Sequence, residues 1–161
     1  MPERTLILLR HAKSDWSNDE VDLVRPLAER GRRQAPDAGR WLNTGVPSID
    51  LAVVSPALRA RSTWKLVAAQ LEIPPHTRID ERLYAASEQE LLEVVRELPE
   101  DVRTVILVGH NPGLEALVSR LTGERVPMPT SALAAIAVSG SWSAAGHSSA
   151  VLTASGRPPE S

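Results

Sequence analysis

The sequence predicts an α/β domain whose central sheet is largely parallel. Short apolar stretches typical of buried strands alternate along the chain with longer amphipathic segments typical of helices, which is the pattern of parallel sheets. The composition is that of an ordinary globular protein, with 42% hydrophobic and 24% charged residues. We interpret residues 1–154 as one domain and residues 155–161 as a disordered tail.

The first predicted strand, Thr5–Leu9, is followed directly by Arg10 and His11. An apolar run of this kind belongs in a protein interior, whereas two cationic groups do not. We therefore expect a buried strand whose carboxyl end opens into a polar site. The polar segment 12–25 that follows is expected to be a loop.

A helix is predicted over residues 27–43. Pro36 is expected to kink this helix or to delay its start, and Gly45 to end it. The short apolar run at 50–55 then predicts a second buried strand.

The dipeptide Ser55-Pro56 predicts the start of the next helix, with serine as the N-cap and proline as the first helical residue. That helix is expected to end near Leu71. Residues 78–84 fit either a short strand or a loop. A capping box at Ser87 predicts a further helix.

The clearest strand is Thr104–Gly109, followed by His110. Asn111 and Pro112 then predict a helix start, again as N-cap and first helical residue. Two late strands are expected at 132–138 and 150–154.

Three predicted strands therefore end at His11, Ser55 and His110. In parallel sheets the carboxyl ends of the strands form the ligand-binding edge, so we expect these residues to lie close together. Arg59 falls in the first turn of its helix, where backbone amides favour a bound anion. The alternative is that Arg59 points to solvent or pairs with an acid.

Arginine and histidine together suit phosphate chemistry. The planar guanidinium groups of Arg10 and Arg59 are able to grip two oxygens at once. A neutral imidazole has a free lone pair with which to attack phosphorus. The sequence thus indicates a phosphate pocket in which His11 or His110 reacts.

These segments resemble the motifs of the histidine phosphatase (phosphoglycerate-mutase-like) superfamily. Two further segments resemble its SixA-type branch, the phosphohistidine phosphatases. The superfamily motifs lie at 9–14, 55–63 and 108–112, and the branch motifs at 25–31 and 129–132.

The resemblance implies a three-layer α/β/α fold with a mixed sheet containing one antiparallel strand. It implies that His11 is the nucleophile and that Arg10, Arg59 and His110 hold the phosphoryl oxygens. It also implies a metal-independent enzyme that needs no organic cofactor.

The chain departs from the family pattern at several positions. Ala12 replaces the usual glycine, and Ser17 stands where many relatives have a phosphate-binding asparagine. Arg25 is a candidate for the pocket rim, with a solvated loop arginine as the alternative. Glu81 is our candidate general acid, with Asp80 as the other choice and a plain surface carboxylate as the alternative.

We expect a phosphatase that works through a phosphohistidine intermediate on phosphohistidine in a protein. The alternatives are a phosphomonoesterase acting on a small metabolite and a non-catalytic phosphate-binding domain. A mutase and a metal hydrolase fit less well.

The net charge of −2 gives no argument for nucleic acid or an anionic membrane as partner. The absence of cysteine fits a cytoplasmic protein, and we expect a monomer.

Overall fold

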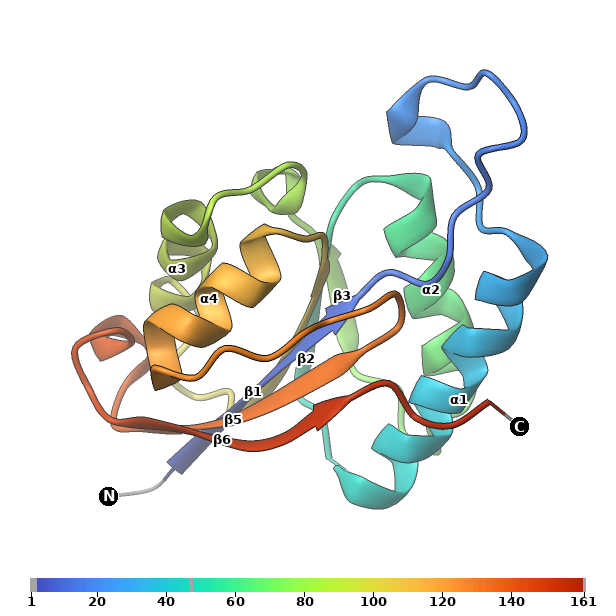
Figure 1. Ribbon diagram of the computed structural model, residues 1–161. Helices are drawn as coiled ribbons and strands as arrows, with labels where there is room; N and C mark the ends of the chain where they lie inside the picture. The colour runs from blue at the N-terminus through green and yellow to red at the C-terminus, as the bar shows by residue number, and fades with distance from the viewer. Residues whose placement is uncertain (1–2, 47, 161) are drawn as a thin grey trace.

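The computed structural model describes residues 3–46 and 48–160. They form six strands: β1 (Glu3–Arg10), β2 (Leu51–Val54), β3 (His76–Ile79), β4 (Thr104–Gly109), β5 (Leu133–Ser139) and β6 (Ala150–Gly156). The main helices are α1 (Glu29–Gly45), α2 (Leu58–Ala68), α3 (Glu88–Arg96) and α4 (Gly113–Thr122). Figure 1 shows α1 and α2 on one face of the sheet and α3 and α4 on the other. The predicted three-layer α/β/α fold is confirmed.

The strands form one mixed sheet in the order β3-β2-β4-β1-β5-β6. Neighbouring pairs among the first four strands are parallel, whereas β5 runs antiparallel to both of its neighbours. Arg10 is paired with Gly109, and Val54 with Val108, so β1, β2 and β4 end at nearly the same level. The predicted meeting of these strand ends at one edge is confirmed.

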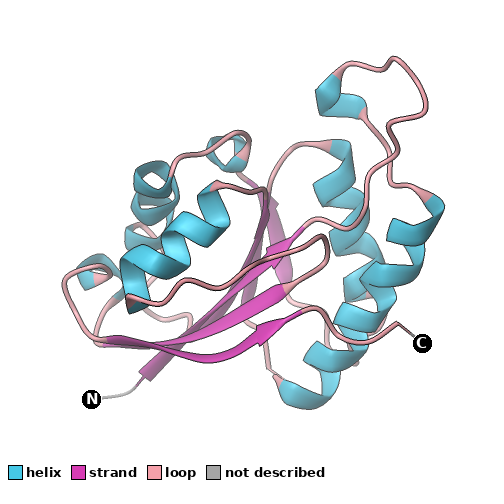
Figure 2. Ribbon diagram, viewed as in Figure 1, coloured by secondary structure: helices cyan, strands magenta, loops and turns pink. Residues whose placement is uncertain are grey.

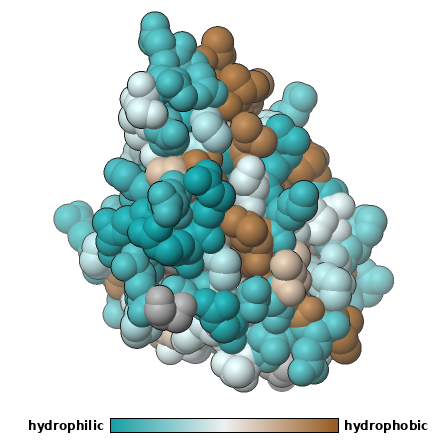
Figure 3. Space-filling view, turned by 90° about the vertical axis from the view of Figure 1, so that its right-hand side faces the viewer, coloured by the Kyte–Doolittle hydropathy of each residue, from teal (hydrophilic) through white to brown (hydrophobic). Residues whose placement is uncertain are grey.

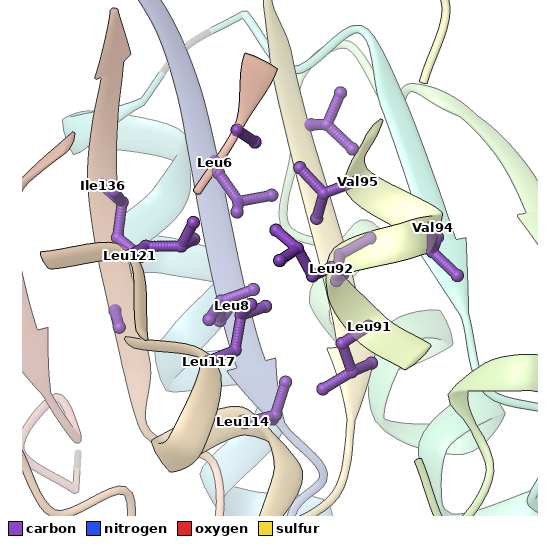
Figure 4. Close-up of a cluster of buried hydrophobic side chains, with 14 of the residues drawn as sticks. Leu6, Leu8, Leu91, Leu92, Val94, Val95, Leu114, Leu117, Leu121 and Ile136 are labelled. Atoms are coloured by element: carbon purple, nitrogen blue, oxygen red, sulfur yellow. The ribbon is translucent and has the colours of Figure 1, made fainter. Parts of the chain in front are cut away.

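Strand β1 is apolar throughout its middle because both of its faces are covered. Leu6 and Leu8 pack against α3 and α4 (Figure 4), whereas Ile7 and Leu9 pack toward α1 and α2. All four side chains are fully buried. Burying each one contributes about 1.5–3 kcal/mol, which fixes the register that places Arg10 and His11 at the sheet edge.

The late start of helix α1 that Pro36 suggested is wrong. The helix begins at Glu29 and continues through Pro36 to Gly45. Proline inside a helix costs about 3 kcal/mol, because it removes a hydrogen bond and crowds the preceding turn. Here Ala35, Ala38 and Leu42 are buried against the sheet, and their packing outweighs that cost.

Two predicted helix starts are also displaced. Helix α2 begins at Leu58 rather than Pro56, and Ala57 is its N-cap. Helix α4 begins at Gly113, after Pro112, which itself occupies the N-cap position. The Ser55 hydroxyl lies against His110 at the sheet edge, which sequence spacing does not reveal. The Asn111 side chain still accepts a hydrogen bond from the first turn of α4, from the Glu115 N–H at 3.3 Å.

The remaining elements follow the predictions more closely. The capping box at Ser87 is present, and the undecided segment near residue 80 forms β3 and a short 3₁₀ helix, Glu81–Leu83. Strand β6 runs to Gly156, so Ser155 and Gly156 do not belong to a tail. Both pair with the start of β5. Ser161, the last residue of the expected tail, lies outside the described residues.

Candidate active site

His11 is fixed by contacts from three parts of the fold. Its backbone N–H donates to Gly109 at 3.1 Å, and its carbonyl oxygen accepts from the Ser131 N–H at 3.0 Å. The next residue, Ala12, donates its N–H to the hydroxyl of Thr63 on α2 at 2.9 Å. The Ala12 methyl group is buried in the apolar cluster on that side of the sheet, so the departure from glycine is accommodated. The result is a rigid histidine that is only 7% exposed.

The hydrogen bond of the His11 ring fixes its tautomer. Nδ1 lies 2.8 Å from the carbonyl oxygen of Ala12. Because a carbonyl only accepts, Nδ1 carries the proton and Nε2 keeps its lone pair. Burial lowers the pKa of His11 to about 4, and the charges of Arg59 and Arg10 act in the same direction. The ring is therefore neutral at pH 7 and is a competent nucleophile.

His110 lies beside His11, with 5.1 Å between the ring centroids. Its Nε2 is 2.7 Å from the hydroxyl oxygen of Ser55, the residue expected to cap α2. The pKa of His110 is lowered to about 3, mainly by burial and in addition by the neighbouring His11 and Arg59. Two neutral imidazoles thus lie side by side at the ends of β1 and β4.

Two arginines complete the positive edge. Arg10 donates to the carbonyl oxygen of Met128 at 3.0 Å, and burial lowers its pKa. Arg59 is 8% exposed and lies on the first turn of α2. Both guanidinium charges are close enough to lower the pKa of His11 and of His110. The four predicted residues, Arg10, His11, Arg59 and His110, therefore form one cluster.

Arg59 is held in place by Asp22, a residue of the short 3₁₀ helix Asp22–Val24. One guanidinium nitrogen donates to the backbone oxygen of Asp22 at 2.8 Å, and another donates to its Oδ2 at 3.0 Å. The Tyr84 hydroxyl donates to the same Oδ2 at 2.6 Å. The bond from Tyr84 and then that from Arg59 lower the pKa of Asp22, so it is an ionised carboxylate. The alternative in which Arg59 pairs with an acid is therefore realised within the cluster.

A cavity of about 490 Å³ opens beside this cluster. Its wall comes from the loop before α1, the start of α2, the segment before α3 and the turn after β4. The lining residues are Asp22, Arg59, Tyr84, Ala85, Ala86, Ser87, Glu90, His110, Asn111 and Pro112. The cavity gives a ligand access to Arg59 and His110.

Two other predicted residues, Ser17 and Arg25, are placed differently. Ser17 is exposed, and its hydroxyl donates to Asp15 at 2.6 Å. Arg25 is buried, but it donates to the backbone oxygens of Asp15, Asn18 and Glu20. It therefore holds the loop together through its two terminal nitrogens, and it does not line the cavity.

Neither candidate acid reaches the cluster. Glu81 is exposed and does not line the cavity. Asp80 accepts two hydrogen bonds from the side chain of Arg82. In the described part of the chain, the carboxylates that line the cavity are Asp22 and Glu90. Glu90 is itself bonded to the backbone N–H of Ser87 through the capping box.

Sequence reasoning missed Asp22 and Tyr84. Asp22 lies in a polar loop among other acids, and nothing in its local sequence distinguishes it. Tyr84 is the single tyrosine of the chain, which was the one available hint. Both partners of Asp22 lie far along the sequence, so only the fold brings them together.

The model of the histidine phosphatase superfamily (branch 1) matches residues 6–103, which is more than half of the chain. The chain belongs to the histidine phosphatase superfamily. A curated but uncharacterised protein of Mycobacterium tuberculosis is 37% identical over 145 residues, covering 83% of this chain and 89% of that protein. A phosphohistidine phosphatase SixA homologue of Haemophilus influenzae is 31% identical over 134 residues, covering 76% and 80%.

Solved structures agree with this assignment. A putative phosphohistidine phosphatase SixA from Nakamurella multipartita superposes with a TM-score of 0.89 at 29% identity, over 98% of both chains. The protein histidine phosphatase SixA in complex with tungstate superposes with a TM-score of 0.82 at 25% identity, over 96% and 97%. This histidine phosphatase is a hydrolase and resembles the SixA branch.

The described residues offer neither a metal-binding cluster nor a membrane-spanning helix. They contain no group of three or more histidine, cysteine or acidic side chains placed to hold a metal ion. No helix in that part of the chain combines the length and apolar character needed to span a bilayer.

Proposed function

We propose that this histidine phosphatase removes the phosphoryl group from phosphohistidine in a protein, through a phosphohistidine intermediate on His11. The observation that carries the proposal is the state of His11. Its ring is neutral, its Nε2 is unprotonated, and it is surrounded by Arg10, Arg59 and His110. Those are the groups that an in-line phosphoryl transfer requires.

In the first step, the lone pair of His11 Nε2 attacks phosphorus. The bond from phosphorus to the substrate nitrogen breaks, and its electron pair stays on the substrate ring, which leaves as a neutral imidazole because its other nitrogen carries a proton. Arg10, Arg59 and His110 stabilise the charge on the three equatorial oxygens. The hydrogen bond from His11 Nδ1 to Ala12 holds the ring as positive charge develops on it.

In the second step, a water oxygen attacks the phosphorus of phosphorylated His11. The bond between phosphorus and Nε2 breaks, and the electron pair returns to His11. The proton lost by water passes to solvent or to the phosphate product. The cycle ends with inorganic phosphate and a neutral His11, ready for a second substrate.

The surroundings of the leaving group favour phosphohistidine as the substrate. An alkoxide needs a proton donor, whereas an imidazole with a free pKa of about 6.5 leaves more readily. Glu81 lies outside the cavity lining, and Asp22 is ionised through its bonds to Tyr84 and Arg59. The SixA proteins that this chain resembles are described as phosphohistidine phosphatases.

The loop between β1 and α1 supports a protein rather than a small molecule as carrier. It projects from the rest of the fold (Figure 2), and Asp22 ties it to Arg59. Figure 3 views the molecule from the side of α1 and α2 and shows apolar residues gathered at the top, where the loop lies. Its exposed apolar side chains are Trp16, Val21, Leu23 and Val24, which are 64%, 74%, 41% and 50% exposed. Such a surface beside a phosphate site suits contact with a folded protein.

A substrate panel tests the proposal. Wild-type protein and His11→Ala are compared on a phosphohistidine protein and on an aryl phosphate. We expect faster turnover of the phosphohistidine protein, and no turnover of either substrate by His11→Ala. Equal or faster turnover of the aryl phosphate would favour the alternative, a phosphomonoesterase acting on a small metabolite.

The matched control is His76→Ala, because His76 is an exposed histidine of β3 outside the cavity lining. This variant should retain wild-type rates. Wild-type activity of His11→Ala would refute the mechanism.

A cytoplasmic location and a monomeric state remain predictions. Cell fractionation would check the location, and sedimentation the oligomeric state.

A further inference from the structure

Ser55 lies at the end of β2 and is completely buried. Its oxygen accepts a hydrogen bond from the Ala57 N–H at 3.3 Å. The hydroxyl hydrogen therefore needs an acceptor of its own, since a buried donor without a partner costs about 1–3 kcal/mol. Within the described residues, the one acceptor in reach is Nε2 of His110, at 2.7 Å.

This contact favours one tautomer of His110. With the ring hydrogen on Nε2, the buried Ser55 hydroxyl hydrogen and the Nδ1 lone pair would both lack partners, whereas with the hydrogen on Nδ1 only that N–H lacks one. If the Ser55 hydroxyl donates to Nε2, then Nε2 is unprotonated and the ring hydrogen of neutral His110 lies on Nδ1. The low pKa of His110, set mainly by burial, keeps the ring in this neutral form. His11 and His110 thus both carry their hydrogen on Nδ1, but their partners differ.

Nδ1 of His110 is buried and has no hydrogen-bond partner among the described residues. A buried N–H donor is rarely left unpaired in a folded protein. The ring of His11 lies 5.1 Å away, centroid to centroid, so a phosphoryl group attached to His11 would bring oxygens next to His110. Those oxygens are the acceptors that Nδ1 lacks in the free protein.

We propose that Ser55 is a positioning residue that sets the tautomer of His110, so that its Nδ1–H donates to a phosphoryl oxygen. Ser55 does not touch the substrate and acts through the imidazole. The inference rests on the proposed function for the identity of the acceptor. The tautomer itself follows from Ser55 and His110 alone.

The tautomer is measured on the ligand-free protein by long-range ¹H–¹⁵N correlation at pH 7, with His110→Asn to assign the signals. We expect the wild-type His110 ring to be protonated on Nδ1. Ser55→Ala should add a population protonated on Nε2, because the donor to that atom is gone. A wild-type ring protonated on Nε2, or an unchanged tautomer in Ser55→Ala, would overturn the inference.

Function is measured on the same variants with a phosphohistidine protein as substrate. Ser55→Ala should lower kcat by roughly 10- to 100-fold, with a smaller change in KM; this is less than the roughly 100- to 1,000-fold loss for deleting an oriented donor, because the His110 ring is still present. Ser55→Thr retains the hydroxyl and should recover part of the loss. Ser148→Ala is the matched control, because it removes a buried hydroxyl that has no hydrogen-bond partner in the described residues and lies at the opposite end of the sheet. An unchanged kcat in Ser55→Ala would also overturn the inference.

The proposed function and the role of Ser55 would be refuted by different results. If the tautomer is as inferred but the wild-type protein turns over no phosphohistidine protein, the proposed function is wrong and the role of Ser55 toward the ring stands. Tungstate then serves as the oxyanion probe. Its affinity should fall about tenfold in Ser55→Ala, and equal affinity would refute the donor role of His110.

Discussion

The pKa of His11 gives a prediction that depends directly on where the fold places the ring. The pKa of His11 is lowered to about 4. Burial is the largest cause, and the charges of Arg59 and Arg10 lower the pKa in addition. At pH 5.5 a group with this pKa is about 97% neutral, whereas a histidine at the ordinary value of about 6.5 is only about 9% neutral. The supply of neutral nucleophile at pH 5.5 is therefore roughly tenfold larger than for an exposed histidine.

The assay is an NMR titration of the histidine ring protons between pH 3.5 and 8. The signal of His11 is assigned by its loss in His11→Asn. We expect a midpoint near pH 4. A midpoint near 6.5 would refute the reasoning, because it would mean that the ring is neither desolvated nor close to the two arginines.

The same shift predicts how stability depends on pH. The unfolded chain binds a proton at His11 near pH 6.5, whereas the folded chain does so near pH 4. Between these values the unfolded state holds more protons, so the free energy of unfolding falls as pH drops through this window. The full effect is on the order of 3 kcal/mol for His11. Urea denaturation at pH 7 and 4.5 should show a smaller loss in His11→Asn than in the wild type.

Three further predictions concern the surroundings of the site. Asp22→Asn keeps the geometry around Arg59 but removes a negative charge, so tungstate should bind roughly tenfold more tightly by calorimetry; weaker binding would show that the charge is needed to position Arg59. Gly31→Ala places a methyl group 2.1 Å from the carbonyl oxygen of Lys13, two residues after His11, so the free energy of unfolding should fall by about 1–3 kcal/mol, and wild-type stability would contradict this. Glu81→Gln should leave turnover of both phosphohistidine protein and aryl phosphate unchanged; a selective loss on the aryl phosphate would restore Glu81 as the general acid.

The sheet was predictable because its strands are buried on both faces. Continuous apolar runs such as Thr5–Leu9 and Thr104–Gly109 have few other uses in a chain of this composition. Their ends carry Arg10, His11 and His110, so the topology of a parallel sheet was enough to bring these residues together. The same argument placed Arg59, one turn after the end of a third strand.

The failures of prediction share one physical cause, which is competition from distant residues. Ser55 fits a helix cap locally, but its hydroxyl is taken by a histidine 55 positions away. Asp22 acquires its role from Arg59 and Tyr84, which lie 37 and 62 positions away. Pro36 is a poor helix residue by itself, and packing against the sheet overrides it. Local spacing contains none of this information.

The most direct test is to trap the phosphoryl group on the enzyme. The protein is mixed with a ³²P-labelled phosphohistidine protein, quenched within milliseconds and digested, and the labelled peptide is identified. The mechanism predicts an acid-labile, base-stable label on the peptide that contains His11, and no label in His11→Asn. Turnover without any trapped label, or a label on His110 or on a serine, would contradict a phosphohistidine intermediate at His11.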